Sequence, residues 1–426
     1  MSPTDSDVLS CLSKTRRKLH QHPEEGWTEF ETTWFVAEEL RKLGFPIKTG
    51  IANIDPLHAL GRSEEKVKKA IERAVAHGVP AKFIEEAGEF TGVVAEVETG
   101  RPGPVTALRF DMDCVCVAET NSPDHIPVKE GFASQNPGLM HACGHDAHTS
   151  VGLSVARWVK DHLAELSGTI RLIFQPAEEG VRGAQAMTAG GTVEGVDYLI
   201  GAHIGGFAKL GEILILQGGI LATTKLDIKF EGIPSHAAAD PEKGRSALLA
   251  ACSAATMIAG IPRHSEGDSR ISIGVLHAGE GRNVTPAHAY MQIETRGITD
   301  HVNDFLTERV QKIVAGVAEA SEVKSSVTIC GTSMTLPPSP ELQAAALQVA
   351  QSIPGIRAAY DSRVSASEDC TVFMNRVVET GGEAVFFMYG ANHHGHHRPD
   401  FDIQDEAMLN GYRMFTRMVA RLNGKN

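Results

Sequence analysis

Short apolar segments alternate with amphipathic segments through the first half of the chain. Residues 28–43 place apolar side chains at three- and four-residue intervals and end at Gly44, which predicts an amphipathic helix. Residues 63–88, rich in Glu, Lys and Ala, predict more helix, and residues 147–166 predict another. Apolar runs rich in β-branched residues predict strands, and these are VVAEVETG, PVTALRFDMD, TIRLIFQP, DYLIGAHI and EILILQGG. The alternation is typical of an α/β fold with a mainly parallel sheet.

A different order of elements begins near Ala222. The next segments predict strand, helix, strand, strand, helix and strand, and they are TTKLDIKFEG, GRSALLAACSAATMIAGI, RISIGVLHAG, HAYMQIETRG, DHVNDFLTERVQKIVAGVAEA and KSSVTICGT. This β-α-β-β-α-β order predicts a ferredoxin-like α+β domain. The proline cluster LPPSPE at 336–341 predicts the linker that ends it.

The remaining elements are expected to complete the first domain. They are a helix at 341–352, the strand EAVFFMYG and a final helix near 404–422. We therefore expect a main α/β domain in two parts, with the ferredoxin-like domain inserted between them, and the boundaries are 1–221, 222–335 and 336–426.

Composition restricts the partners and the compartment. A chain of 426 residues exceeds what one compact core usually supports, which agrees with two domains. The net charge of -13 and the absence of a basic run longer than the RRK at 16–18 argue against nucleic acid. No apolar stretch approaches the length of a membrane span, and the first residues lack the core of a signal peptide. We expect a cytoplasmic protein that does not bind membranes.

The seven cysteines are scattered and odd in number, which does not indicate a disulfide framework and favours a reducing compartment. Cys114 and Cys116 alternate within a predicted strand. We expect both to be buried apolar side chains rather than metal ligands.

The stretch MHACGHDAHTS at 140–150 concentrates one cysteine, three histidines and one aspartate. It allows a redox cysteine, a nucleophile with its base, or a metal site. A redox site favours C-x-x-C, which is absent, and the Asp-x-His that follows supplies more ligand types than a Cys143–His145 dyad needs.

Three further polar groups follow predicted strands, namely RFDMD at 109–113, QPAEEG at 175–180 and GAHIG at 201–205. Strand ends are where α/β proteins place ligands. Thiolate, imidazole and carboxylate together suit Zn²⁺ or a similar divalent ion. In the doublet Glu178–Glu179 one carboxylate can bind metal while its neighbour acts as a base. Each of these motifs alone also has a non-functional interpretation. A Glu-Glu pair is usually exposed to solvent, and His203 could be a buried histidine with its hydrogen bonds satisfied.

In these motifs the chain resembles the dinuclear-metal aminoacylase and carboxypeptidase superfamily, specifically its amidohydrolase branch. The resemblance also includes LHQHPEEGWTEFETT, GIPSHAA, GRNVTPAHA, SASEDC and HHRPDF, and it spans nearly the whole chain in order. Within the branch, the helical insertion after Gly44, the segment EFTGVVAEVETGRPGPV and the ETRG at 294–297 resemble the A subunits of p-aminobenzoyl-glutamate hydrolases. Indole-acetyl-aspartate hydrolases are the alternative within this group.

The resemblance implies two divalent metal ions, Zn²⁺ or Mn²⁺, with Co²⁺ also tolerated. Cys143 matches a thiolate that bridges the two ions. His145 and His203 match ligands of one ion, and Glu179 and a C-terminal histidine match ligands of the other. The candidates for that histidine are His393, His394, His396 and His397. The spacing to the following Pro-x-Phe in the family favours His397.

The remaining implied roles concern catalysis and substrate binding. Glu178 matches the general base, and Asp113 matches a carboxylate that orients a metal ligand. His236, in the inserted domain, matches the residue that reaches the oxyanion. Asn283 and Arg296 match positions near the carboxylate of the bound amino acid, and a guanidinium suits that group physically, although Arg296 could instead be a surface strand residue. No ligand role is assigned to Asp146 and His148.

The resemblance further implies hydrolysis of the amide bond of an N-acyl or N-aroyl amino acid. The expected substrate is p-aminobenzoyl-glutamate, cleaved to p-aminobenzoate and glutamate. Alternatives are indole-acetyl-aspartate, N-acyl amino acids in general, or a noncatalytic metal-binding protein, against which the presence of Glu178 argues. The inserted domain is expected to act as a lid and to mediate dimerisation, with His236 serving the partner's site. A hetero-oligomer with a related B subunit is the other expectation.

Overall fold

The computed structural model describes residues 4–364 and 366–425, which form two compact units. Unit 1 runs to Gly219 and resumes at Leu336–Arg363 and from Asp369 onward, and unit 2 is Ile220–Thr335 with Val364–Glu368. Each unit has its own cluster of buried apolar side chains. Residue 365, the first of the SASEDC motif, lies outside the described residues.

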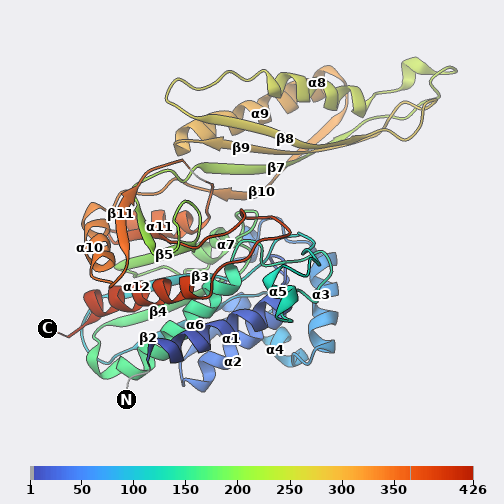
Figure 1. Cartoon of the computed structure of the whole chain (residues 1–426). Coiled ribbons are helices and arrows are strands. Elements are labelled where there is room, and N and C mark those ends of the chain that lie inside the picture. The colour runs from blue at the N-terminus through green and yellow to red at the C-terminus, as the bar shows by residue number, and fades with distance from the viewer. Residues whose placement is uncertain (1–3, 365, 426) are drawn as a thin grey trace. The chain divides into compact units, whose positions relative to one another are not determined.

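Unit 1 is built on an eight-stranded sheet (Figure 1). Its strands in sheet order are β1 (Ile47–Thr49), β2 (Val93–Glu98), β4 (Thr169–Gln175), β3 (Val105–Asp111), β5 (Tyr198–Ile204), β12 (Glu383–Tyr389), β6 (Glu212–Leu216) and β11 (Arg357–Asp361). The pairs β3–β4, β3–β5, β5–β12 and β6–β11 are parallel, whereas β1–β2, β2–β4 and β6–β12 are antiparallel. The prediction of a mainly parallel α/β sheet is confirmed.

Helices cover both faces of this sheet (Figure 1). The helices of unit 1 are α1 (Asp5–Gln21), α2 (Phe30–Lys42), α3 (Glu64–Ala76), α4 (Ala81–Glu86), α5 (Ile126–Lys129), α6 (His145–His162), α7 (Gly183–Ala189), α10 (Pro340–Gln351), α11 (Cys370–Glu379) and α12 (Glu406–Asn423). Helices α6 and α12 pack on one face, and α7 and α11 pack on the other. Both faces of the central strands are therefore buried, which explains their nearly continuous apolar sequences.

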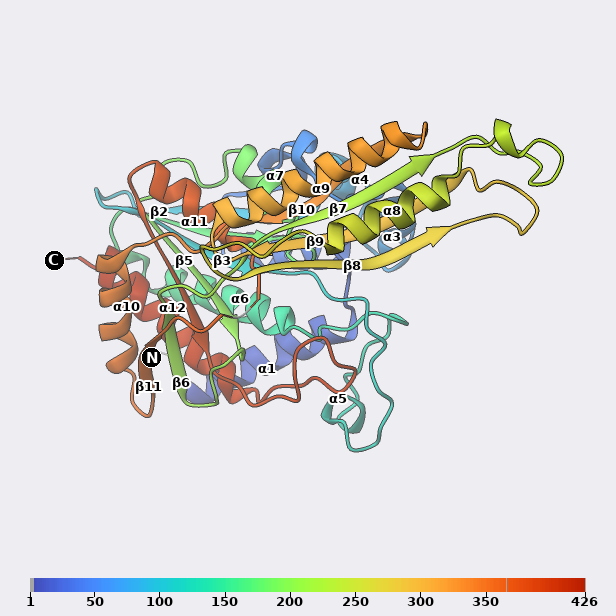
Figure 2. The same cartoon turned by 90° about the horizontal axis from the view of Figure 1, so that it is seen from above.

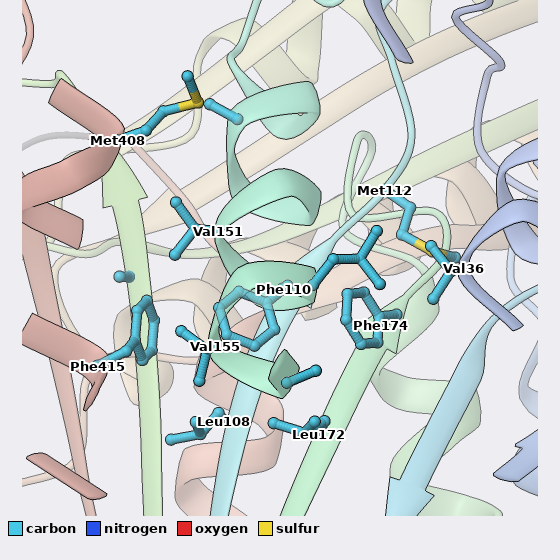
Figure 3. Close-up of a cluster of buried hydrophobic side chains, with 14 of the residues drawn as sticks. Val36, Leu108, Phe110, Met112, Val151, Val155, Leu172, Phe174, Met408 and Phe415 are labelled. Carbon is cyan, nitrogen blue, oxygen red and sulfur yellow. The ribbon is translucent and has the colours of Figure 1, made fainter. Parts of the chain in front are cut away.

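The alternation of side chains in β3 separates the two layers. Leu108 and Phe110 point into the core beneath α6 and α12, where Phe110 lies 4.8 Å from Phe415 between ring centroids (Figure 3). Arg109 points to the other face and donates a hydrogen bond at 3.1 Å to Asp369, the N-cap residue of α11. Successive residues of β3 therefore contact helices on opposite faces of the sheet, because side chains alternate between the two faces along a strand.

The α-helices and strands described in unit 2 follow the predicted β-α-β-β-α-β order, with a short 3₁₀ helix at Pro241–Lys243 between the first strand and the first helix. They are β7 (Ala222–Glu231), α8 (Ala247–Ala259), β8 (Ser269–Ala278), β9 (His288–Gly297), α9 (Asp300–Ala320) and β10 (Lys324–Ser333). The strands pair antiparallel in the order β10-β7-β9-β8, and α8 and α9 lie side by side on one face of this sheet (Figure 2).

Several details differ from the sequence predictions. The helix predicted at 63–88 is two helices, because Pro80 caps α4 and interrupts the pattern. Strand β11 and helix α11 were not predicted. Cys114 is buried as expected, but Cys116 is exposed, so its prediction as a buried residue is wrong. Among the described residues, no helix combines the length and the apolar character needed to cross a membrane.

Candidate metal centre

Functional side chains converge at the carboxyl ends of neighbouring strands in unit 1. Asp113 follows β3, Glu178 and Glu179 follow β4, His203 lies near the end of β5, and His397 follows β12. The order β4-β3-β5-β12 makes these strands adjacent, and their parallel pairing brings the four ends to the same edge of the sheet. This edge is where an open α/β sheet binds ligands.

The start of α6 contributes Cys143 and His145 to the same edge. Gly144, between them, is the N-cap residue and has a φ of 86°. A Cβ atom at Gly144 would lie 2.5 Å from Cγ2 of Ile204, at the end of β5. Only glycine combines this backbone conformation with this close approach, which explains the glycine within the CGH motif.

Cys143 lies at the centre of two groups of ligand-type atoms. In one group it is joined by Glu179 and His397, and in the other by His203 and His396, with all ligand atoms of a group within 4.8 Å of one another. Cys143 Sγ lies 3.4 Å from His203 Nε2 and 3.6 Å from His396 Nδ1, and His397 Nε2 lies 3.2 Å from Glu179 Oε1. A side chain shared by two groups is what a bridging ligand requires.

His145 supplies a further ligand-type atom to this site. Its ring is fully buried, yet its Nε2 atom has no hydrogen-bond partner among the described residues. Its Nδ1 atom lies 3.3 Å from Asp113 Oδ1, which orients the ring. Buried polar atoms are normally paired, and a histidine held at one nitrogen by a carboxylate commonly binds metal through the other. The residues present therefore fit a metal centre.

Asp113 connects the ligands with the carboxylate doublet. This fully buried side chain accepts hydrogen bonds from the backbone N–H groups of Glu178 and Glu179, at 3.1 and 2.9 Å. Together with its contact to His145, the carboxylate holds three functional residues in one arrangement. Because Glu178 Oε2 lies 3.9 Å from His145 Nε2, the doublet faces the ligand group.

Glu29 holds the same loop from the other side, a role that the sequence did not reveal. Ala177 has a φ of 52°, which is unusual for a residue with a Cβ atom, and its N–H donates a hydrogen bond to Glu29 Oε1 at 2.7 Å. Thr91 donates to the other oxygen at 2.7 Å. Burial, followed by the charge of Asp113, raises the pKa of Glu29 to about 8. The residue belongs to the LHQHPEEGWTEFETT motif, which was the available signal.

Burial and neighbouring charges shift the pKa values of the ligand-type side chains. Burial lowers the pKa of His145, but the charge of Asp111, followed by the hydrogen bond with Asp113, outweighs burial and raises it well above its ordinary value. Burial, followed by the charge of Glu179, raises the pKa of Cys143 well above its ordinary value. Burial lowers the pKa of His203, followed by repulsion from His148. The centre thus contains a thiol facing carboxylates and a neutral imidazole, and a divalent cation would stabilise the thiolate in this environment.

Asp146 and His148 have structural partners. His148 Nδ1 lies 2.5 Å from Asp111 Oδ1, and its Nε2 atom accepts the N–H of Ile204 at 2.9 Å. Asp146 accepts a hydrogen bond from Arg16 at 3.3 Å. These contacts attach the first turn of α6 to β3, β5 and α1.

Arg16, part of the basic run in the sequence, is a buried residue. Its guanidinium pairs with Asp146, Asp402 and Asp405, and it therefore joins the start of α6 to the segment that follows His397. His20 lies one turn further along α1 and contacts Asp146 at 2.8 Å. Burial lowers the pKa of His20, but its hydrogen bonds, with Asp146 first, outweigh burial and raise it to about 9.

Three predicted residues lie in unit 2. His236 pairs with Val284 in an isolated bridge, next to Asn283, whose carbonyl accepts the N–H of Ala237 at 3.1 Å. The Nδ1 atom of His236 accepts N–H groups from the following turn, at 3.1 and 3.2 Å, so its proton is on Nε2. Arg296, on β9, forms an ion pair with Glu294 on the same strand at 3.0 Å.

Comparison with known proteins identifies the family of the chain. Residues 107–421 match the model of peptidase family M20/M25/M40. The chain belongs to this family. A homolog of the A subunit of p-aminobenzoyl-glutamate hydrolase, from Haemophilus influenzae, is 42% identical, covering 97% of this chain and 99% of that protein. Indole-3-acetyl-aspartic acid hydrolase from Enterobacter agglomerans is 41% identical, covering 94% and 93%.

Solved structures give the same result. The aminobenzoyl-glutamate utilization protein from Klebsiella pneumoniae is 35% identical, with a TM-score of 0.84 over 98% of this chain and 97% of that one. A Bacillus subtilis protein described as a dinuclear metal binding peptidase shares the fold at 24% identity, with a TM-score of 0.69 over 98% and 99%. The sequence prediction of the amidohydrolase branch is confirmed, and the chain is a hydrolase of this family.

Proposed function

We propose that this hydrolase uses two divalent metal ions to cleave p-aminobenzoyl-glutamate into p-aminobenzoate and glutamate. The observation that carries the proposal is that Cys143 lies beside His203 in one group of ligand-type atoms and beside Glu179 and His397 in another. The substrate follows from the 42% identity to the A subunit of p-aminobenzoyl-glutamate hydrolase from Escherichia coli, which extends over 94% of this chain. Zn²⁺ and Mn²⁺ are the expected ions, and Co²⁺ would also suit sulfur, nitrogen and oxygen ligands.

Cys143, His145, His203, Glu179 and His397 are the proposed ligands. The ions would polarise the scissile carbonyl and acidify a water molecule. Beside them, Glu178 would take the proton from the attacking water and return it to the leaving amine. Asp113 and Glu29 keep that carboxylate in place through the backbone of its loop.

Residues of unit 2 would complete the reaction. His236 carries its proton on Nε2, as a donor to the developing oxyanion must. Arg296 and Asn283 are the proposed partners of the substrate carboxylate. Arg296 would then share its guanidinium between Glu294 and the substrate, which a planar group with five N–H donors can do.

We further propose that unit 2 mediates self-association. Helix α8 contains no charged residue, and it exposes Leu249 by 64% and Met257 by 54%. Strand β8 lies at the end of the sheet order, beside this apolar surface. An apolar helix face next to a sheet edge is suited to a second copy of the chain or to a related B-type chain. The described cysteines are all free, which supports a cytoplasmic location.

The test is hydrolysis by the purified chain loaded with Zn²⁺, Mn²⁺ or Co²⁺. Turnover of p-aminobenzoyl-glutamate should exceed turnover of indole-3-acetyl-aspartate, and chelation should remove it. The 41% identity to an indole-3-acetyl-aspartic acid hydrolase makes that conjugate the second candidate. A preference for the indole conjugate would replace the proposed substrate, and metal binding without hydrolysis of either would refute the proposed reaction.

A further inference from the structure

Two histidines face the sulfur of Cys143, and only His203 of the two is among the proposed ligands. His203, from β5, approaches with its Nε2 atom at 3.4 Å. His396, from the segment after β12, approaches with its Nδ1 atom at 3.6 Å. His397, the next residue, points to Glu179 instead. The chain thus places an additional imidazole beside the proposed bridging thiolate.

The second hydrogen bond of each ring determines what that ring presents to the sulfur. His203 Nδ1 lies 2.8 Å from the carbonyl oxygen of Ile204, so Nδ1 carries the proton and Nε2 presents a lone pair. In His396 the situation is reversed. Its Nε2 atom accepts the N–H of Gly206 at 3.2 Å, so Nε2 holds the lone pair and Nδ1 carries the proton. One ring therefore presents a metal-ligand atom, and the other presents a donor.

The surroundings hold the His396 ring in this orientation. Its centroid lies 5.1 Å from that of Phe401 and 4.4 Å from that of His393. On the other side, a Cβ atom at Gly205 would lie 3.3 Å from His396 Nε2 and 2.8 Å from His393 Nε2. Gly205 and Gly206 have φ values of 75° and 61°, so the glycine pair both adopts this backbone and leaves room for the rings.

We propose that His396 is a positioning residue that donates its Nδ1–H to the thiolate of Cys143. The inference rests on the proposed metal centre, in which Cys143 bridges two ions. A hydrogen bond to a thiolate stabilises the sulfur lone pairs and fixes their direction. It therefore reduces how strongly the sulfur donates electrons to the ions, while His203 and His397 remain the ligands. The hydrogen bond from His396 would thus orient the sulfur of Cys143 in addition to its bonds with the metal ions.

The test uses the Co²⁺-substituted full chain, in which a coordinated thiolate gives a sulfur-to-metal charge-transfer band in the near ultraviolet. In His396→Ala the band should move to lower energy, because the sulfur lone pairs lose their stabilisation. The Co²⁺ content and the visible ligand-field bands should remain those of the wild type. In His396→Asn the amide N–H takes the place of Nδ1–H, so the band should return toward the wild-type position.

His394→Ala is the matched control, because this exposed histidine of the same segment pairs with Asp400 and should leave the spectrum unchanged. An unmoved band in His396→Ala would overturn the inference. Loss of Co²⁺ or altered ligand-field bands, without rescue by asparagine, would instead identify His396 as a ligand. If the wild type binds Co²⁺ without any charge-transfer band, the bridging thiolate of the proposed function fails first, and this inference fails with it.

Discussion

Replacing Asp113 by alanine should weaken the fold and the metal centre by separable amounts. The change leaves two buried backbone N–H groups, those of Glu178 and Glu179, without their acceptor. Each unsatisfied group costs about 1–3 kcal/mol, so the metal-free protein should lose about 2–6 kcal/mol of unfolding free energy. His145 also loses the partner of its Nδ1 atom, which should lower metal affinity about 10- to 100-fold. At saturating metal, that loss removes roughly 1.4–2.7 kcal/mol of ligand-induced stabilisation.

The assay is chemical unfolding in the presence of chelator and again at a buffered concentration of free Zn²⁺, together with competition against a chelator of known affinity. Asp197→Ala is the matched control, because its carboxylate accepts the N–H of Val105 at 2.8 Å, at the opposite end of β3. It should lower stability slightly and leave metal affinity unchanged. The measured affinity is corrected for the fraction of Asp113→Ala that is unfolded. If the corrected affinity equals that of the wild type, Asp113 does not orient a metal ligand.

Four further outcomes are expected. Cys143→Ser should lose metal and activity together, and full metal occupancy would count against a bridging thiolate. Glu178→Gln should keep its metal while kcat falls about 10²- to 10⁴-fold, whereas Glu179→Gln should lose metal affinity; the opposite pattern would exchange their roles. His236→Ala and Glu178→Gln should each be nearly inactive. If each site uses both chains of a two-fold dimer, equal co-expression should recover roughly a quarter of wild-type activity, because about half of the dimers are mixed and each of these has one intact site. Mixed dimers as inactive as their parents would exclude a shared site. The raised pKa of His20, from 6.5 to about 9, corresponds to about 3 kcal/mol of stability that is present below pH 6.5 and lost as pH rises through 9. Unfolding free energies measured from pH 6 to 10 should show this decline, and His20→Gln should not.

Most of the architecture and the chemistry of the site could be established from the order of residues alone. Strand and helix periodicities are local properties, so the β3, β4, β5 and β12 segments and the order of unit 2 could be identified without a structure. The types of ligand-forming side chain are also local. Because Glu179 and His203 lie at the ends of predicted strands of a parallel sheet, their meeting at one sheet edge could be anticipated. The place of Cys143 beside them was implied by the family resemblance and not by the strand pattern.

Which polar residues are buried, and what each one contacts, became evident only in the folded chain. Arg16 belongs to the basic run at 16–18, yet it is buried and its partner Asp402 lies 386 positions away. Glu29 holds Ala177 across 148 positions, and no local pattern encodes that pairing. The proton on His396 depends on the N–H of Gly206, a contact between two loops. Periodicity depends on residues close together in the sequence, so it predicts helices and strands. Burial and these hydrogen bonds depend on segments that are distant in the sequence, so only the tertiary structure determines them.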